Sequence, residues 1–168
     1  MNEFQDPRTI REIVHTARTV AIVGLSASEL RASHFVGYYL KRHGYRVIPV
    51  NPNEERVLGE QAYPSLRDVP EPIDVVDVFR DPSAVPDLAR EAVEVDAGAL
   101  WLQFGVISPE GARIAQEGGL EVVMDRCLKV EHARLLGRMH WMGFDTGVIA
   151  GSRHPSRPGR PPARAGRR

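Results

Sequence analysis

The stretch TVAIVGLSASELRASHFVGYYLKRHGYRVIPVNP, residues 19–52, decides the fold. It opens with a short apolar, β-branched run over 19–23 that ends at Gly24, a pattern typical of a strand buried on both faces. Apolar residues then recur at helical spacing over 35–40, and a second apolar run follows over 45–50. The stretch therefore predicts a strand, a helix and a second strand, which together form the repeating unit of a parallel sheet.

The rest of the chain continues this alternation. Three more apolar runs are predicted to be strands, over 73–78, 99–104 and 120–124. A capping residue followed by proline indicates helix starts at Asp6-Pro7, Asp81-Pro82 and Ser108-Pro109, and a last short helix is expected over 130–136. The connection over 54–72 is too rich in Pro and Gly for one long helix, but it could hold a turn from Leu66 onward. We therefore predict an α/β chain with a Rossmann-like, doubly wound parallel five-stranded sheet and helices on both faces.

Composition and charge narrow the class of protein. With 168 residues, 42 % of them hydrophobic and 26 % charged, the chain has the size and composition of one soluble globular domain. Six of the 22 basic residues lie in 151–168, which has no acidic residue, so residues 1–150 hold 16 basic and 22 acidic groups and a net charge of −6. An acidic body has no general attraction for nucleic acid, so we expect a small partner that a few local donors hold.

Several other classes of site and location are disfavoured. The first residues lack the basic start and apolar run of a secretory signal, and no apolar stretch is long enough to span a bilayer. We therefore expect a cytoplasmic protein with no membrane partner. Cys127 is the only cysteine, which excludes an intramolecular disulfide and a cysteine-based zinc site. The six histidines show no paired ligand spacing, so no metal is expected.

Glycine and polar residues follow the predicted strands. In an open parallel sheet, ligands bind beyond the carboxyl ends of the strands, at the point where the strand order reverses. The residues at these ends are Gly24, Leu25, Ser26, Asn51, Pro52, Phe79, Arg80, Gln103, Asp125, Arg126 and Cys127. Turns after strands favour Gly, Asn, Pro and Asp whatever their function, so position alone leaves both explanations open.

The loop after the first strand suits an anion but lacks the dinucleotide fingerprint. Backbone N–H groups near Gly24 and at the following helix start could hold a phosphate that a side chain at Gly24 would obstruct. The second and third glycines of GxGxxG are missing, and so is the P-loop lysine. Asn51 stands where an NAD site has a carboxylate for the ribose hydroxyls. A nicotinamide site is therefore disfavoured.

Three side chains near the strand ends are candidate phosphate ligands. Arg31 and Ser33 offer a cation and a hydroxyl suited to a pyrophosphate, although a solvated arginine and an ordinary helix-capping serine are equally simple explanations. Arg80 could pair with a ribose phosphate or bridge to Asp81. His34 could donate to a phosphate from the same helix start, but a histidine on a helix is more often structural.

Five stretches carry a family resemblance. VAIVGLSASELRASH, GYRVIPVNPN, IDVVDVFR, LWLQFGV and VVMDRCLKVEHARL lie in this order and span most of residues 8–136. They resemble the small stand-alone CoA-binding proteins with a Rossmann-like fold, akin to the CoA-binding domain of the succinyl-CoA synthetase α subunit. One departure is Ala32, where the family often has proline; this change loosens the loop without removing a contact.

The resemblance implies coenzyme A as the ligand, held across the strand ends. It implies a pyrophosphate near the first loop, an adenosine 3′-phosphate near the ends of the second and third strands, and a pantetheine arm running toward the fourth. The residues implied are, in that order, Gly24, Leu25, Ser26, Arg31 and Ser33; Asn51, Pro52, Phe79 and Arg80; and Gln103.

The resemblance and the composition divide the chain into three parts. Residues 1–136 are expected to form the CoA-binding domain. Residues 137–150 include Trp141 and Phe144 and could dock on the body as a C-terminal extension. Residues 151–168, rich in Arg, Pro, Gly and Ala, are expected to be a basic disordered tail.

The densest polar cluster invites a catalytic hypothesis. It consists of Asp125, Arg126, Cys127, Lys129, Glu131 and His132. A thiol near a histidine could act as a nucleophile, and a mixed disulfide with CoA could form if Cys127 lay near the pantetheine thiol. The favoured alternative is that Cys127 is a small buried apolar residue, Asp125 a turn acceptor, and Arg126 with Glu131 an internal ion pair. We therefore assign no catalytic residue.

Two classes of function remain. The first is a protein that binds CoA or a short acyl-CoA without catalysis of its own, as a carrier, sensor or regulator. The alternative is an enzyme subunit of an acyl-CoA-dependent or nucleotide-dependent transferase or oxidoreductase. A homodimer is compatible with the exposed edges of such a sheet.

Overall fold

Five parallel strands form the centre of the molecule. The computed structural model describes residues 3–137 and has one sheet in the order β2-β1-β5-β6-β7, in which every neighbouring pair is parallel. The strands are β1 (Thr19–Val23), β2 (Arg46–Val50), β5 (Val75–Val78), β6 (Ala99–Leu102) and β7 (Glu121–Met124). The chain runs from β1 to the edge strand β2 and then returns to the other side of β1, so the strand order reverses between β1 and β5. The predicted five-stranded parallel sheet is confirmed.

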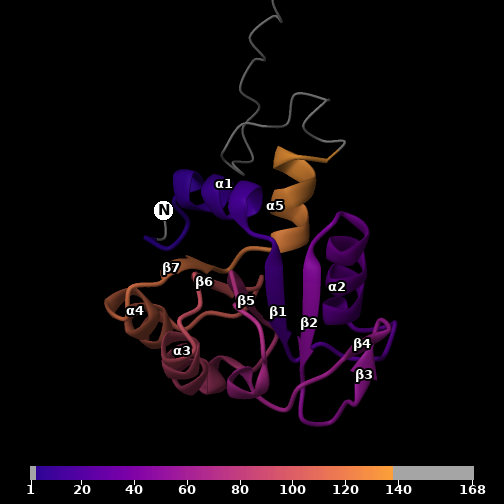
Figure 1. Ribbon diagram of the computed structural model, residues 1–168. Helices are drawn as coiled ribbons and strands as arrows, with labels where there is room; N and C mark the ends of the chain where they lie inside the picture. Colours follow the sequence, from indigo (N-terminus) through magenta and orange to yellow (C-terminus); the bar gives the residue numbers. More distant parts are fainter. Residues whose placement is uncertain (1–2, 138–168) are drawn as a thin grey trace, which may run out of the picture.

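Helices cover both faces of this sheet (Figure 1). They are α1 (Pro7–Thr16), α2 (Ala32–Arg42), α3 (Val85–Glu94), α4 (Pro109–Glu117) and α5 (Leu128–Leu135). Helices α1, α2 and α5 pack on one face, and α3 and α4 pack on the other. The Rossmann-like, doubly wound arrangement is therefore confirmed. Within residues 3–137, no helix is long and apolar enough to cross a membrane.

Side-chain caps fix the helix starts that the sequence predicts. The Asp6 carboxylate accepts from the backbone N–H of Arg8 at 3.0 Å, and the Ser108 hydroxyl accepts from the N–H of Gly111 at 3.2 Å. In both helices a proline follows the cap and needs no N–H partner in the first turn. A capping side chain contributes about 1 kcal/mol to helix stability, so these local signals position α1 and α4.

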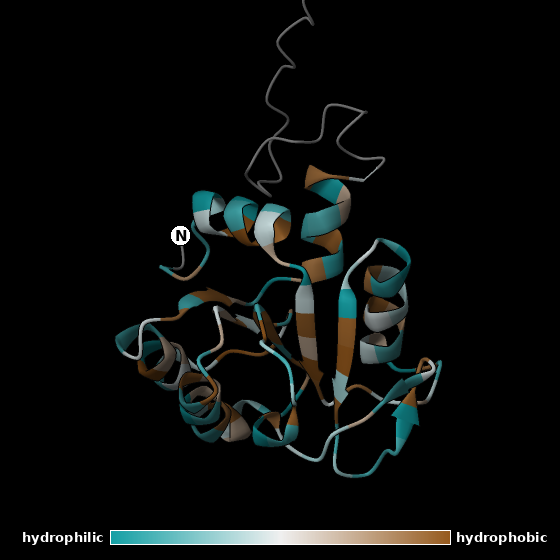
Figure 2. Ribbon diagram, viewed as in Figure 1, coloured by the Kyte–Doolittle hydropathy of each residue, from teal (hydrophilic) through white to brown (hydrophobic). Residues whose placement is uncertain are grey.

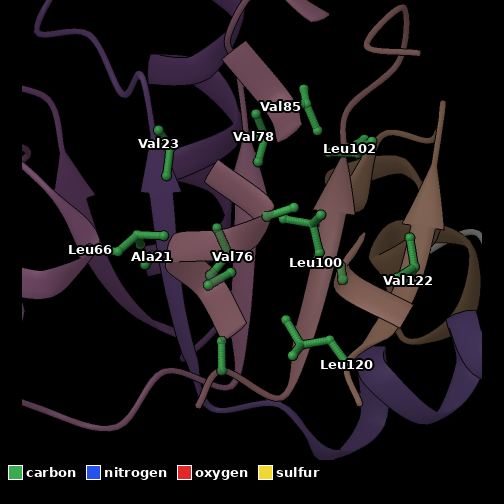
Figure 3. Packing of buried hydrophobic residues seen from close by; sticks show 14 of the residues in the cluster. Ala21, Val23, Leu66, Val76, Val78, Val85, Leu100, Leu102, Leu120 and Val122 are labelled. Carbon is green, nitrogen blue, oxygen red and sulfur yellow. The ribbon is translucent and has the colours of Figure 1, made fainter. Parts of the chain in front are cut away.

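The strands alternate between two apolar cores. Ala21 and Val23 of β1 join the core under α3 and α4, which Figure 3 shows, whereas Val20 and Ile22 join the core under α1, α2 and α5. In Figure 2 the middle of β1 and β2 is mostly hydrophobic, whereas α1 and α2 mix hydrophilic and hydrophobic residues. This pattern is that of strands buried on both faces and of helices with one buried face.

The long connection between β2 and β5 contains a small hairpin that we did not predict. Strands β3 (Arg56–Val57) and β4 (Glu60–Gln61) pair antiparallel, and the two residues between them, Leu58 and Gly59, both have positive φ. Such a two-residue turn matches the twist of a hairpin. The turn expected from Leu66 is present as the 3₁₀ helix η1 (Leu66–Asp68). Asp81 caps a second 3₁₀ helix, η2 (Pro82–Ala84), which leads directly into α3.

Four rings pack together where α2, β2 and α5 meet. Tyr39 and His43 of α2 stack at 4.0 Å between ring centroids, and the Tyr39 hydroxyl lies 2.9 Å from Nδ1 of His132 in α5. Tyr45 contacts the His132 ring edge-on and donates from its hydroxyl to the carbonyl of Val14 in α1 at 2.7 Å. Burial, with smaller contributions from His43 and His15, lowers the pKa of His132 to about 4. As a neutral ring, His132 therefore links α5 directly to α2, and it reaches α1 only through Tyr45.

A carboxyl group is buried in the middle of the sheet. Asp77 of β5 has no exposed surface, its Oδ1 accepts from Nε2 of Gln103 at 2.7 Å, and its Oδ2 has no hydrogen-bond partner among residues 3–137. Burial raises the pKa of Asp77 to about 7, against a smaller lowering by the Gln103 hydrogen bond. The Asp77 carboxyl therefore changes between its protonated and its ionised form near neutral pH.

We expect acidification to destabilise the protein through His132. Because its pKa is about 4 in the folded protein and about 6.5 in the unfolded chain, the unfolded chain binds the proton first. The contribution of His132 is complete above about pH 6.5 and is lost as the pH falls toward about 4, by about 2–3 kcal/mol. Urea denaturation should show that the stability advantage of the wild type over His132→Gln shrinks over this interval. A difference that stays constant with pH would contradict the assignment.

The opposite pH dependence is expected for Asp77. Its pKa is raised in the folded protein, so the unfolded chain ionises first and the stability of the wild type falls as the pH rises from about 4 to about 7. Relative to Asp77→Asn, which keeps the oxygen acceptor for Gln103, the wild type should lose on the order of 3 kcal/mol over that interval. The free energies of unfolding of the two proteins at acidic and at mildly alkaline pH measure this loss. Parallel curves would show that Asp77 does not titrate there.

Candidate functional site: a cleft where the strand order reverses

The ends of β1, β2 and β5 open onto a cleft of about 460 Å³. It lies at the carboxyl ends of these strands and beside the start of α2, where doubly wound sheets bind their ligands. The cleft is lined by Gly24, Ser26, Arg31, Ala32, Ser33, Asn51, Asn53, Glu54, Phe79 and Arg80. Seven of the ten residues predicted for the site thus lie together, from three loops that are distant in the sequence.

Gly24 holds two strand ends against each other. Its N–H donates to the carbonyl of Val50 at 2.8 Å, and its φ of +88° lies in a region that favours glycine. A Cβ at this position would lie 2.4 Å from the carbonyl oxygen of Phe79 and 3.2 Å from Cδ of Arg80. The backbone itself therefore requires glycine here, in addition to any need to leave room for an anion.

Hydrogen bonds shape the loop that follows Gly24. The N–H of Ser26 donates to the buried hydroxyl of Ser33 at 3.1 Å, and the hydroxyl of Ser26 accepts from the N–H of Ser28 at 3.1 Å. Nδ1 of His34 lies 2.9 Å from the carbonyl of Ser26. Ser33 and His34 therefore tie the loop to the first turn of α2, and the structural explanation for His34 is the one the contacts favour.

Helix α2 begins without a side-chain cap. Arg31 occupies the N-cap position and makes no capping bond, so the expectation of a helix-capping Ser33 is wrong: Ser33 lies inside the first turn. Within residues 3–137, the backbone N–H groups of Ala32 and Ser33 have no hydrogen-bond partner. Unpaired amides at a helix start attract anions, and both residues line the cleft.

Two guanidinium groups flank these amides. Arg31 and Arg80 are both exposed, and neither forms an ion pair or a side-chain hydrogen bond within the described part of the chain. Within residues 3–137, Arg80 does not bridge to Asp81, whose Oδ1 instead accepts from the N–H and the hydroxyl of Ser83. The cleft therefore carries two cations with free donors in a body whose net charge is negative.

Asn51 connects the loops instead of offering a free amide. Its Nδ2 donates to the carbonyl of Leu25 at 3.1 Å, and its Oδ1 accepts from the N–H of Asn53 at 3.0 Å. Glu54 adds a second connection, because its Oε1 accepts from the N–H of Ala27 at 3.0 Å. The loops after β1 and β2 are thus joined at two points beside the cleft.

Three predicted site residues lie outside this lining. Leu25 is fully buried in the core under α2, and the Gln103 side chain is almost fully buried on Asp77. Pro52 lines a neighbouring hollow of about 140 Å³, which Arg80 also borders. All three follow strands, as predicted, but their side chains pack in the core, on Asp77 or in the neighbouring hollow.

Asn53 and Glu54 line the cleft although neither was predicted as a site residue, and Ala32, noted above only as a departure from the family pattern, lines it as well. The turn Asn-Pro-Asn-Glu was the available signal, because an Asn that bonds two residues on makes the chain fold back toward its start. The side-chain contact between Glu54 and Ala27 has no counterpart in local sequence.

The polar cluster around Cys127 has the contacts of a structural unit. Oδ1 of Asp125 accepts from the N–H of Gly105 at 2.8 Å, and Glu131 is buried between Arg126 and Arg134. Burial raises the pKa of the half-buried Cys127 thiol above its usual range, and the nearby Asp77 carboxyl raises it further. A raised pKa disfavours the reactive thiolate, so the contacts favour the structural explanation for this cluster.

Comparison with known proteins identifies relatives of the same size. The family model described as a CoA binding domain matches residues 18–133. The uncharacterized protein YneT of Bacillus subtilis (strain 168) is 41 % identical over 124 residues, which are 74 % of this chain and 92 % of YneT. A hypothetical protein from Pyrococcus horikoshii OT3 has a similar solved structure, with 40 % identity and a TM-score of 0.76 over 78 % of this chain and 92 % of that one.

A larger relative is named as an enzyme. The ADP-forming acetate–CoA ligase II of Archaeoglobus fulgidus is 28 % identical over 102 residues, which are 59 % of this chain but 15 % of the ligase. The similarity to the CoA-binding part of such synthetases agrees with the resemblance seen in the sequence. On the match to the family model over 18–133 and the identity with relatives of its own size, the chain belongs to the family of CoA-binding domains.

Proposed function

We propose that the protein binds coenzyme A, or a short acyl-CoA, in the cleft at the strand ends, as a carrier, sensor or regulatory component. The observation that carries the proposal is the donor set of the cleft: around one cavity lie two guanidinium groups and two helix amides that have no partner within residues 3–137. Such a set suits a ligand with several phosphates. Membership of the CoA-binding family selects CoA among such ligands.

The pyrophosphate of CoA would lie at the start of α2. The free amides of Ala32 and Ser33 and the guanidinium of Arg31 provide donors there. Gly24 lines the same space without a side chain. Ser26 and Ser33 contribute mainly by shaping the loop, because the Ser33 hydroxyl already accepts from the N–H of Ser26.

The adenosine end would lie toward β2 and β5. Arg80 borders both the cleft and the small hollow beside Pro52, so its guanidinium could meet the 3′-phosphate while the hollow received part of the adenosine. The half-buried Phe79 offers an apolar surface on the same side. Asn51 would support this end by holding the loop, since both polar atoms of its amide are bonded within the chain.

The pantetheine arm would run from the cleft toward β6. Gln103 follows β6, and its Nε2 is committed to Asp77, so only its Oε1 is left to meet an amide N–H of the arm. Leu25 would take part only as the apolar floor beneath the loop.

The proposal also covers the kind of partner, the location and the assembly of the protein. A small ligand suits the negative body charge, which favours neither nucleic acid nor an acidic membrane surface. A cytoplasmic location and a homodimer through a sheet edge complete the proposal. The expected C-terminal extension over 137–150 and the basic tail over 151–168 fall almost wholly outside the residues that the structure describes.

Calorimetric titration tests the proposal. We expect binding of CoA and acetyl-CoA in the micromolar range at moderate salt, with weaker binding of dephospho-CoA and no competition by NADH. Arg80→Ala should weaken CoA binding roughly tenfold or more, because a hydrogen bond to a charged group contributes about 1.5–3 kcal/mol. The same variant should change dephospho-CoA binding much less, since that ligand lacks the 3′-phosphate.

Arg90→Ala is the matched control. It removes an exposed guanidinium from α3 whose ion pair, in the part of the chain that the structure describes, is with Asp87 at the surface, so CoA affinity should stay unchanged. A folded wild type that gives no heat with CoA or acetyl-CoA would overturn the proposal. Equal losses for CoA and dephospho-CoA in Arg80→Ala would remove Arg80 from the 3′-phosphate.

A further inference from the structure

A buried polar pair interrupts the apolar core under α1, α2 and α5. Val75 and Trp101 belong to that core, and alternation along β5 and β6 puts Asp77 and Gln103 on the same face. Asp77 has no exposed surface and Gln103 keeps 3 %, yet a single hydrogen bond joins their side chains. Burying a carboxyl group with so few partners costs stability, so packing alone does not explain the pair.

The pair lies next to the strand end that borders the cleft. Gln103 directly follows β6, and its N–H donates at 3.4 Å to the carbonyl of Val78, the last residue of the neighbouring strand β5. Phe79, the next residue along the chain, lines the cleft. Gln103 is therefore the buried polar side chain on the side of the cleft where the proposed function places the pantetheine arm.

Asp77 determines which end of the Gln103 amide is free. An ionised carboxylate can only accept hydrogen bonds, so the NH₂ group of Gln103 faces it and donates from Nε2 at 2.7 Å. Oε1 of Gln103 has no hydrogen-bond partner within residues 3–137. The pair thus offers one acceptor, and the pantetheine arm carries amide N–H groups that can donate to it.

Protonation of Asp77 removes this constraint. A protonated carboxyl group has an O–H that can donate to Oε1, which allows the Gln103 amide to turn and present its NH₂ group instead. Burial raises the pKa of Asp77 to about 7, so both forms of the carboxyl group occur near neutral pH.

The surroundings of Asp77 contribute no second charge that titrates in this range. Its neighbours in register are Ile22 of β1 and Trp101 of β6, which have no titratable group. The Cys127 thiol at the start of α5 is close enough to interact with the carboxyl group, and burial raises the thiol pKa above its usual range. Lys129 of α5 lies over two aromatic rings of α2, at 4.7 and 5.2 Å from their centroids.

We propose that Asp77 is a positioning residue for the arm of the ligand: as a carboxylate it holds the Gln103 amide so that Oε1 accepts from an amide N–H of the pantetheine arm. This inference rests on the proposed function and adds a contact that is independent of the phosphates.

Two variants separate the acceptor from the group that orients it. Gln103→Met keeps an unbranched side chain of similar length and removes the acceptor. Asp77→Asn keeps the size of the side chain, but its amide can accept from Gln103 or donate to it, so neither orientation is favoured. Glu117→Gln is the matched control for the lost charge, because Glu117 is exposed on α4, which covers the other face of the sheet.

Calorimetric titration compares CoA with its nucleotide half that lacks the arm, adenosine 3′-phosphate 5′-diphosphate. At about pH 8 we expect CoA affinity to fall roughly fivefold in Gln103→Met and roughly threefold in Asp77→Asn, the size of one uncharged hydrogen bond or less. Both variants should bind the armless nucleotide as the wild type does, and Glu117→Gln should bind both ligands unchanged. Losses of the same size for both ligands, or no loss for CoA, would overturn the inference.

A pH profile distinguishes positioning from packing. The ratio of wild-type CoA affinity to that of Asp77→Asn should rise from about one at about pH 5.5 to about three at about pH 8, because only the wild type has a carboxyl group that ionises between them. Titration of the ligand phosphates is the same for both proteins and cancels in this ratio. A ratio that does not change with pH would contradict the positioning role, while CoA binding by the wild type would leave the proposed function intact. A wild type that binds neither ligand would overturn both.

Discussion

The close approach of β1 to the end of β5 at Gly24 is the constraint on which the site depends. The N–H of Gly24 is bonded to Val50 of β2, while the space that a side chain would need is taken by the carbonyl of Phe79 after β5. Three strand ends are thereby held within one small region. Gly24 must adopt a left-handed conformation where the chain leaves β1, and the loop that follows leads to α2. The anion-binding features follow from that path.

The protein is acidic as a whole, but its cleft attracts anions locally. Residues 1–150 carry a net charge of −6, yet the cleft presents Arg31, Arg80 and two unpaired helix amides. Many of the other basic side chains at the surface are paired, as Arg46 is with Glu60 and Glu71. A highly charged ligand is therefore held by a few donors at one place, and the surrounding surface gives a polyanion such as nucleic acid no extended track to follow.

The sequence predicts the fold well because local signals agree with the tertiary structure. The run over 19–23 and the Asp6-Pro7 and Ser108-Pro109 starts specify elements that the structure places at the same residues. The β3–β4 hairpin was missed because its strands are too short to show a period. The strand ends predicted the place of the site. Leu25 and Gln103, which follow β1 and β6, are nevertheless buried, because Leu25 packs in the core and Gln103 bonds to Asp77, and these tertiary contacts leave no signal in the local sequence.

The strand ends hold two kinds of polar group, and the difference between them bears on how the cleft works. Asp77 and Gln103 are sealed beneath the loops, where a proton can be stored but solvent does not enter. Arg31 and Arg80 are exposed to solvent, and the loop before Arg31 is held by Asn51 on one side and by Ser33 on the other. Because the backbone donors are fixed before any ligand arrives, binding need not order the loop, and less free energy is lost on association.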